Sequence, residues 1–306
     1  MSSATLSDVS SVRTFDASDW TIERAVAAKV GRTVSVCIPC KNEAATIGPI
    51  VAMMRETLMD TTHLIDELIV LDDNSIDDTA AVAAAAGATV VSVNVINERY
   101  GPGKGKGNAL WATVLSSTGD FILWCDGDVT SVEASWVVRL LMPLLTTPDV
   151  ALVKASYHRP TDLGGGGRTT ELVARPMLSL FLPELTGLHQ PLSGEFAARR
   201  EAAEAIPFVQ GWGVEIAMLA DIASRFGSQS IAQVDVGERR HRHQTLDRLG
   251  LQAAEVLATL LSRVGAADHF AQESLALLRP NGTAEALNLD ERPPARTVDV
   301  RCDLRG

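Results

Sequence analysis

The chain has 306 residues, of which 46% are apolar and 21% are charged, as is usual for a soluble globular protein with a sizeable core. Its formal net charge of −11 disfavours general binding to nucleic acid or to anionic lipid, so an anionic ligand needs a local basic cluster. No apolar run approaches the roughly 20 residues of a membrane-spanning helix, and the polar N-terminus lacks the apolar segment of a secretory signal. We therefore expect a cytoplasmic protein.

The predicted elements alternate between strand and helix from about residue 30 to residue 157. A polar tail and a short helix over residues 18–29, capped by Ser18 or Asp19, come first. Strands are then predicted at residues 33–38, 67–71, 90–95, 121–125 and 150–157, and helices at 44–58, 75–86, 108–117 and 135–145. The second of these helices opens with the S-x-x-D form of a capping box. This alternation with short links predicts an α/β fold with a doubly wound, mostly parallel sheet.

The second half of the chain is less regular. A four-glycine loop at residues 164–167 precedes Arg168, and the later elements are predicted as helices at 170–182, 214–226 and 245–264 and a strand at 231–236. We divide the chain into an N-terminal tail and helix (1–30), a nucleotide-binding α/β half (31–157), an acceptor-binding half of the same domain (158–264) and a C-terminal tail (265–306). That tail is expected to have low order or to form an arm over a partner.

The sequence FILWCDGD at residues 121–128 contains the strongest local signal. Its apolar part is predicted to be a strand buried on both faces, and side chains two apart on an extended chain point to the same side. Asp126 and Asp128 can therefore converge just past the carboxyl end of the strand, where open α/β sheets bind ligands. Two converging carboxylates suit a hard divalent cation that also holds phosphate oxygens. Alone, a D-x-D also fits a solvated acidic turn.

Other local motifs exclude several common nucleotide sites. The turn after the first strand has no glycine, so it is not the G-x-G-x-x-G of a dinucleotide-binding fold, and the loop GPGKGKG lacks the G-K-[ST] ending of a P-loop. Cys37 and Cys40 form a C-x-x-C without a second pair, which favours neither zinc nor redox chemistry. What remains are acidic residues at successive strand ends, with Lys104 and Lys106 placed to neutralise phosphate. The acidic residues are Glu43, Asp72, Asp73, Asp126 and Asp128.

Longer motifs carry a family resemblance. Residues 33–43, 71–79 and the D-x-D resemble the nucleotide half of a GT-A glycosyltransferase. GGGRTTELVARP, PLSGE, GWGVEI and ATLLSR in the second half resemble the glucosyl-3-phosphoglycerate synthases and the related mannosyl-3-phosphoglycerate synthases. The similarity runs from about residue 20 to residue 264. It implies a retaining, metal-dependent homodimer that moves a hexose, with glucose favoured, from a nucleotide donor to the 2-hydroxyl of 3-phosphoglycerate. Mg²⁺ or Mn²⁺ is the implied cofactor.

The resemblance also implies roles for individual residues. The implied catalytic residues are Glu215, beside the donor sugar, Asp126 and Arg168. The implied nucleotide-sugar contacts are Pro39, Cys40, Lys41, Glu43, Asp73, Lys106, Asp126 and Gly127. The implied acceptor contacts are Gly167, Arg168, Thr170 and His243, and the implied metal ligands are Asp128 and His241. The chain departs from the family at Asp73, where a small residue is usual, and at His243, where an asparagine is usual.

Several alternatives stay open at this stage. The donor can be UDP-glucose or GDP-mannose, the enzyme can be another GT-A glycosyltransferase that acts on lipid or polysaccharide, or the pocket can serve a non-catalytic nucleotide-sugar sensor. Trp111 and Trp212 are predicted to be core aromatics rather than sugar platforms. Arg239, Arg240 and Arg242 are predicted to form mostly a solvated face.

Overall fold

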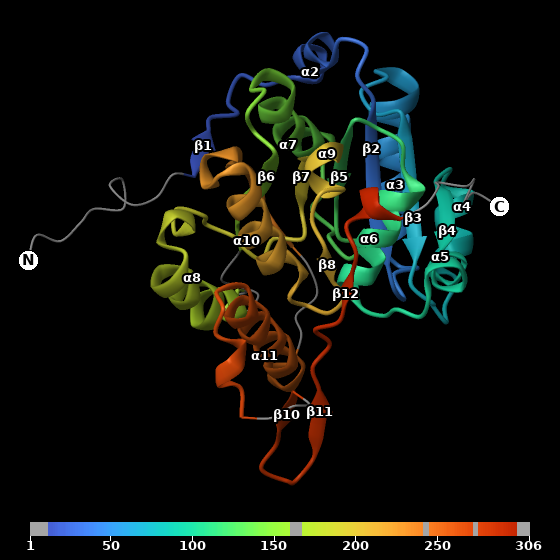
Figure 1. Ribbon diagram of the computed structural model, residues 1–306. Helices are drawn as coiled ribbons and strands as arrows, with labels where there is room; N and C mark the ends of the chain where they lie inside the picture. The colour runs from blue at the N-terminus through green and yellow to red at the C-terminus, as the bar shows by residue number, and fades with distance from the viewer. Residues whose placement is uncertain (1–11, 160–166, 241–244, 272–274, 299–306) are drawn as a thin grey trace, which may run out of the picture.

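The computed structural model describes residues 12–159, 167–240, 245–271 and 275–298 (Figure 1). Its centre is an eight-stranded sheet in the order β1-β9-β6-β7-β5-β2-β3-β4. The strands are β1 (Arg13–Phe15), β2 (Val34–Cys40), β3 (Glu67–Asp72), β4 (Thr89–Ser92), β5 (Phe121–Trp124), β6 (Leu152–His158), β7 (Phe196–Arg199) and β9 (Ile231–Glu238). The predicted α/β fold with a mostly parallel sheet is confirmed.

One antiparallel strand interrupts the parallel order. The neighbours β5, β2, β3 and β4 are parallel, and so are β6, β9 and β1, but β7 lies antiparallel between β5 and β6. The sequence did not predict β7, because FAAR is short and half alanine and carries little strand propensity. This insertion matters for function, since it brings the preceding loop alongside the end of β5.

Helices cover both faces of the sheet. The buried residues of α2 (Ile22–Lys29), α3 (Ile47–Met54), α4 (Thr79–Ala85) and α7 (Ala134–Thr146) pack on one face. The other face is covered by α5 (Val93–Tyr100), α6 (Lys106–Ser116), α8 (Arg175–Phe181), α9 (Arg200–Ala203), α10 (Val214–Phe226) and α11 (Leu246–Arg263). None of the described helices combines the length and the apolar character needed to cross a membrane.

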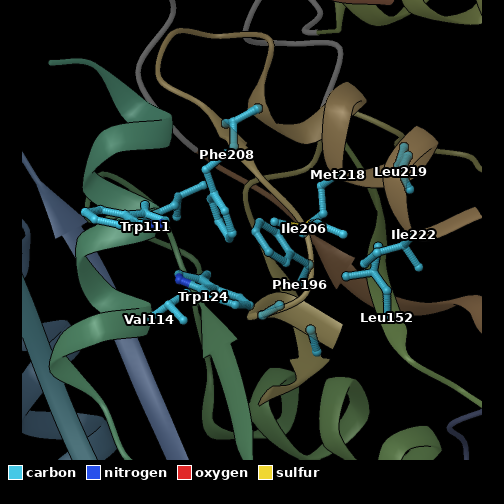
Figure 2. Packing of buried hydrophobic residues seen from close by; sticks show 14 of the residues in the cluster. Trp111, Val114, Trp124, Leu152, Phe196, Ile206, Phe208, Met218, Leu219 and Ile222 are labelled. Carbon is cyan, nitrogen blue, oxygen red and sulfur yellow. The ribbon is translucent and has the colours of Figure 1, made fainter. Parts of the chain in front are cut away.

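Aromatic packing fixes α6 and α10 on the sheet. Trp111 of α6 is fully buried, and Trp124 of β5 packs against Phe196 of β7 with ring centroids 4.8 Å apart (Figure 2). The indole nitrogen of Trp124 donates a hydrogen bond of 2.8 Å to the hydroxyl of Thr113, so no buried donor is left unpaired there. Trp111 is a core aromatic, as predicted.

Two helix starts differ from the prediction. The first helix begins at Ile22, where the Thr21 hydroxyl accepts from the amide of Arg24, so neither Ser18 nor Asp19 is its cap. The capping box at residues 75–78 does not form. Ser75 accepts a hydrogen bond from the amide of Asn42 instead, and the helix starts at Thr79. A side chain that bonds across to a neighbouring turn is not available to cap its own helix.

The described part of the C-terminal segment is ordered, contrary to the prediction for the tail. Strands β10 (Ala276–Leu278) and β11 (Ala284–Ala286) form a hairpin beside α11, and β12 (Glu291–Arg292) pairs with β8 (Phe208–Val209). Arg292 is buried and donates to Asn108 on α6 (2.7 Å) and to the carbonyl of Tyr100 (2.9 Å). Such contacts depend on the tertiary fold and leave no periodic pattern in the sequence.

Candidate active site

A cavity of about 680 Å³ lies at the carboxyl ends of β2, β3 and β5, between the sheet and α11. Most of the predicted site residues line it, and they are Pro39, Cys40, Lys41, Glu43, Asp73, Lys106, Asp126, Gly127, Asp128, Gly167, Arg168, Thr170 and Glu215. His241 and His243 lie outside the described residues. Parallel strands end at the same edge of a sheet, so residues more than 80 positions apart meet in one cavity.

The D-x-D is fixed against the strand beside it. A Cβ atom on Gly127 would lie 2.6 Å from the sulfur of Cys40, so the backbone there passes too close for any larger residue. The hydroxyl of Thr46 donates a hydrogen bond of 2.7 Å to the carbonyl of Gly127. Gly127 and Cys40 therefore shape the cavity by close packing.

Lys106 joins two carboxylates from different elements. Its Nζ lies 3.0 Å from Oδ1 of Asp126 and 2.8 Å from Oε1 of Glu215, which is buried at the start of α10. Burial alone would lower the pKa of Lys106, but the charges of Asp126 and Glu215 together outweigh it and raise that pKa. Lys106 is therefore a fixed cation in the cavity wall, between Asp126 and Glu215.

Arg239 holds the other oxygen of Asp126, and the prediction that it belongs to a solvated face is wrong. Its side chain is 5% exposed, and Nη2 lies 3.0 Å from Oδ2 of Asp126 and 2.8 Å from Oε1 of Glu195. Arg240 next to it is exposed as predicted, and Arg242 lies outside the described residues. A basic run alternates along an extended strand, so one member can point inward while its neighbour faces solvent.

Asp128 is the carboxylate that best fits a cation. Burial and the charge of Asp126 together raise the pKa of Asp128 to about 6, although the charge of Arg239 opposes this rise. Among the residues that the structure describes, none forms a hydrogen bond or ion pair with this carboxylate. A half-buried carboxylate with a raised pKa and no hydrogen-bond partner there suits a divalent metal. Within the same ranges, no group of three or more His, Cys, Asp and Glu side chains is placed to hold a metal.

Part of the cavity wall is built from the turns after β2 and β3. The Nζ of Lys41 lies 3.4 Å from Oδ2 of Asp73, and the amide of Glu43 donates a hydrogen bond of 2.8 Å to Thr79. Burial raises the pKa of Asp73, and the charge of Lys41 opposes this rise. These bonds tie the two turns into one wall that leaves the acidic side chains facing the cavity.

The lining of the same cavity also includes a basic and an aromatic side chain, Arg168 and Trp212. Gly167 has a φ of +84°, a conformation that favours glycine, and the chain enters a helix directly after it at Arg168. Trp212 is 38% exposed and lines the cavity, so the prediction that it is a core aromatic is wrong. Its amide donates to Glu255 on α11, which fixes the residue at the cavity wall while the ring stays accessible.

Sequence reasoning missed several residues that the fold brings to the cavity. Gly194 packs against Asp126 so closely that a Cβ atom there would lie 2.2 Å from Oδ2 of that residue. Glu195 is fully buried against Arg239, and Tyr157 and Arg159 at the end of β6 also line the cavity. Two of these residues, Gly194 and Glu195, belong to the PLSGE motif, and this motif was the sequence signal that indicated them.

Comparisons with known proteins define the class. A family model described as Glycosyl transferase family 2 matches residues 35–206, which include the turns after β2 and β3 and the D-x-D. The chain is 43% identical over 293 residues to a glucosyl-3-phosphoglycerate synthase from Mycolicibacterium smegmatis, covering 92% of this chain and 95% of that protein. It is 44% identical over 237 residues to the protein of that name from Petrotoga mobilis, covering 76% and 73%. The chain therefore belongs to the glucosyl-3-phosphoglycerate synthase family.

Solved structures agree with this assignment. The glucosyl-3-phosphoglycerate synthase from Mycobacterium tuberculosis, in complex with Mn²⁺, UDP-glucose and phosphoglyceric acid, matches with a TM-score of 0.84 and 41% identity over 93% of this chain and 98% of that one. The same enzyme with Mg²⁺ and UDP matches with a TM-score of 0.82.

Proposed function

We propose that the protein is a retaining glucosyltransferase that moves glucose from UDP-glucose to the 2-hydroxyl of 3-phosphoglycerate and gives glucosyl-3-phosphoglycerate. The observation that carries the proposal is a single cavity whose lining combines two chemically different groups of residues. Carboxylates and Lys106 surround the D-x-D, and Arg168 stands at a helix start in the same lining. The first group suits a metal-bound nucleotide diphosphate and the second a small anionic acceptor.

Asp128 and His241 are the residues that would hold Mg²⁺ or Mn²⁺. The half-buried carboxylate of Asp128, with its raised pKa, supports this role. When bound, the cation neutralises charge on the diphosphate leaving group.

The chain's own residues supply orientation and charge around the donor. Lys106 forms ion pairs with Asp126 and Glu215. In this proposal Lys106 faces the diphosphate of the donor, and the two carboxylates lie beside its sugar. Pro39, Lys41, Glu43 and Asp73 form the nucleotide wall. A retaining transfer of this kind needs no strong general base, because the leaving diphosphate can accept the proton of the attacking hydroxyl. Catalysis then rests on positioning and on charge stabilisation.

The acceptor is held by Gly167, Arg168, Thr170 and His243 in this proposal. The first residues of the helix that starts at Arg168 line the cavity, where helix-start amides suit an anion and the guanidinium adds a bidentate donor. Residues 31–157 then bind the donor and residues 158–264 the acceptor.

The test measures the release of the nucleotide diphosphate with and without the acceptor and with two different donors. With Mn²⁺, we expect UDP release from UDP-glucose only when 3-phosphoglycerate is present, and at least about tenfold slower turnover with GDP-mannose, because the pocket contacts that select a base or a sugar are worth only 1–3 kcal/mol each. Faster turnover with GDP-mannose would move the assignment to the mannosyl enzymes. Release of UDP that does not depend on an acceptor would contradict the function itself.

We also propose that the protein is a cytoplasmic homodimer and that neither nucleic acid nor membrane is a partner. Support for the dimer comes from large exposed apolar side chains on neighbouring elements, namely Leu172, Leu180 and Leu246, which are 69–74% exposed. Light scattering at tens of micromolar protein is expected to give the mass of two chains. A monomer at that concentration contradicts the dimer and leaves the catalytic proposal untouched.

A further inference from the structure

Arg159 lines the cavity directly after β6 and is held in place on two sides. Its Nη1 donates a hydrogen bond of 2.9 Å to the side-chain carbonyl of Gln190, and its Nη2 donates one of 3.0 Å to the hydroxyl of Tyr157. The guanidinium carbon lies 4.8 Å from the centroid of the Tyr157 ring. These contacts fix the plane of the guanidinium, so the group is pre-organised before a ligand arrives.

One donor of this guanidinium is unpaired among the described residues. Nε of Arg159 is buried and forms no hydrogen bond within those residues, and the same is true of the hydroxyl of Thr169, which also lines the cavity. Leaving a buried donor unpaired is costly, and buried orphan donors at a cavity wall are explained when a ligand pairs with them. The Nε edge of an arginine is one of its two bidentate edges for a carboxylate.

Arg159 lies next to the start of the acceptor helix. A Cβ atom on Gly167 would be 2.9 Å from Nη1 of Arg159 and 4.0 Å from Cβ of Thr170. Both oxygens of Glu171 on the same helix accept hydrogen bonds of 2.9 Å from Arg175, and the charge of Arg159 acts on this carboxylate only as a weaker contribution to its lowered pKa. The lining of the cavity therefore has two cationic groups, Arg159 and Arg168.

Two cations match the chemistry of the proposed acceptor. A 3-phosphoglycerate molecule has a phosphate at one end and a carboxylate at the other, and a single guanidinium can clamp one of them. The backbone amides at the helix start, together with Arg168, favour the phosphate. The carboxylate is then left for a second cationic group with an unpaired donor, such as Nε of Arg159.

We propose that Arg159 binds the acceptor carboxylate and so selects 3-phosphoglycerate over acceptors that lack this group. The inference rests on the proposed function and extends it to a residue outside the sequence motifs. A site built to bond a polar group rejects an analogue that lacks it, because its own buried donors are then left unpaired. Glycerol 3-phosphate is the matched analogue, since a hydroxymethyl group replaces the carboxylate and the rest is unchanged.

The test compares the two acceptors in wild type, Arg159→Met and Arg159→Lys, with Arg225→Ala as the control. Arg225 is an exposed arginine at the end of α10 and lies outside the cavity lining. We expect Arg159→Met to raise the KM for 3-phosphoglycerate about 30-fold or more, as when a buried charged partner is lost. The KM for UDP-glucose should change by less than about twofold, since only the acceptor's charged partner is lost. The preference for 3-phosphoglycerate over glycerol 3-phosphate, as a ratio of kcat/KM, should fall by a similar factor.

Two further measurements make the outcome decisive. Arg159→Lys keeps the charge without the bidentate edge, so we expect only partial rescue of the preference, and Arg225→Ala should match the wild type. Calorimetric binding of both acceptors to each variant reports the same preference without turnover. Three results for Arg159→Met would overturn the role of Arg159. They are an equal loss of affinity for both acceptors, an equal loss of affinity for donor and acceptor, and no loss of affinity. Wild-type protein that binds 3-phosphoglycerate with this preference but does not transfer glucose would overturn the proposed function alone, and wild type that does not bind it overturns both.

Discussion

Nη2 of Arg239 lies 3.0 Å from Oδ2 of Asp126, although the two residues are 113 positions apart in the chain. The same nitrogen lies 2.8 Å from Glu195, and Lys106 binds the other oxygen of Asp126 at 3.0 Å. Each oxygen of Asp126 is therefore held by a different cation. The carboxylate is oriented by the protein before a donor binds, which is the pre-organisation that electrostatic catalysis requires.

The pair of Glu195 and Arg239 should be costly to break from one side. Glu195→Ala leaves the guanidinium of Arg239 buried with one carboxylate instead of two, and we expect a loss of about 3–5 kcal/mol in the free energy of unfolding. The double variant Glu195→Ala with Arg239→Met should lose less than the sum of the two single variants, because no unpaired charge is left. Urea denaturation measures both.

The exposed pair of Glu171 and Arg175 provides the control. Glu171→Ala should cost less than about 1 kcal/mol, as is usual for a surface ion pair. Strictly additive losses for Glu195 and Arg239 would show that the two side chains do not act together.

Gly194→Ala tests the packing under Asp126 without removing any polar group. The added methyl would lie 2.2 Å from Oδ2 of Asp126, so that carboxylate must move. We expect kcat/KM for UDP-glucose to fall at least about tenfold, since a displacement of 1 Å in a positioned group can cost that much or more. Gly250→Ala in α11 is the control, because its added methyl would meet only the far end of the flexible Arg279 side chain, at 3.0 Å from Nη1, and should leave kcat/KM within about twofold of the wild type. Unchanged kcat/KM in Gly194→Ala would contradict the positioning of Asp126.

Asp128→Asn should stabilise the metal-free protein at pH 7.5. The folded-state pKa of Asp128 is raised to about 6 from an ordinary value of 3.8, so the folded protein loses stability as pH rises through this window. Asparagine carries no charge. We expect the free energy of unfolding of the variant to exceed that of the wild type by at most about 3 kcal/mol above pH 6, and by less at pH 5. Chemical denaturation at both pH values measures this gain. A variant that is less stable than the wild type at pH 7.5 would contradict the conclusion that the charge of Asp128 destabilises the metal-free protein.

In the wild-type protein, the affinity for Mn²⁺ should decrease as the pH is lowered. Below about pH 6, protons compete with the cation for the carboxylate of Asp128. Only a neutral imidazole can bind a metal ion, so protons would also compete with the cation for His241 in a similar pH range. Titration of Mn²⁺ at a fixed concentration of UDP should give weaker binding at pH 5.5 than at pH 7.5. Equal affinity at the two pH values would exclude Asp128 as a ligand.

Parts of this site could be predicted from the sequence because their signals are local. Asp126 and Asp128 follow an apolar strand with a spacing of two, and Glu43 and Asp73 follow neighbouring parallel strands, so a single rule of sheet geometry brings them together. The motif around Arg168 was long enough to indicate the family.

Other parts depend on tertiary structure that leaves no local pattern. Glu195 reaches Arg239 only because β7 runs antiparallel between two strands, and the charge run that contains Arg239 is indistinguishable from a solvated loop. Trp212 sits on the cavity wall because its amide is bonded to α11, which no spacing in the sequence indicates. The order of the C-terminal segment likewise rests on Arg292 and its partners on distant elements.

The most direct test of the central claim is the structure of the reaction product. The protein is incubated with Mn²⁺, UDP-glucose and 3-phosphoglycerate, and the product is examined by proton and phosphorus NMR. We expect one UDP for each molecule of a glucoside linked through the 2-hydroxyl of 3-phosphoglycerate, with the same α configuration at the anomeric carbon as in the donor. A β-linked product, free glucose as the main product, or no glucoside at all would contradict a retaining transfer to 3-phosphoglycerate.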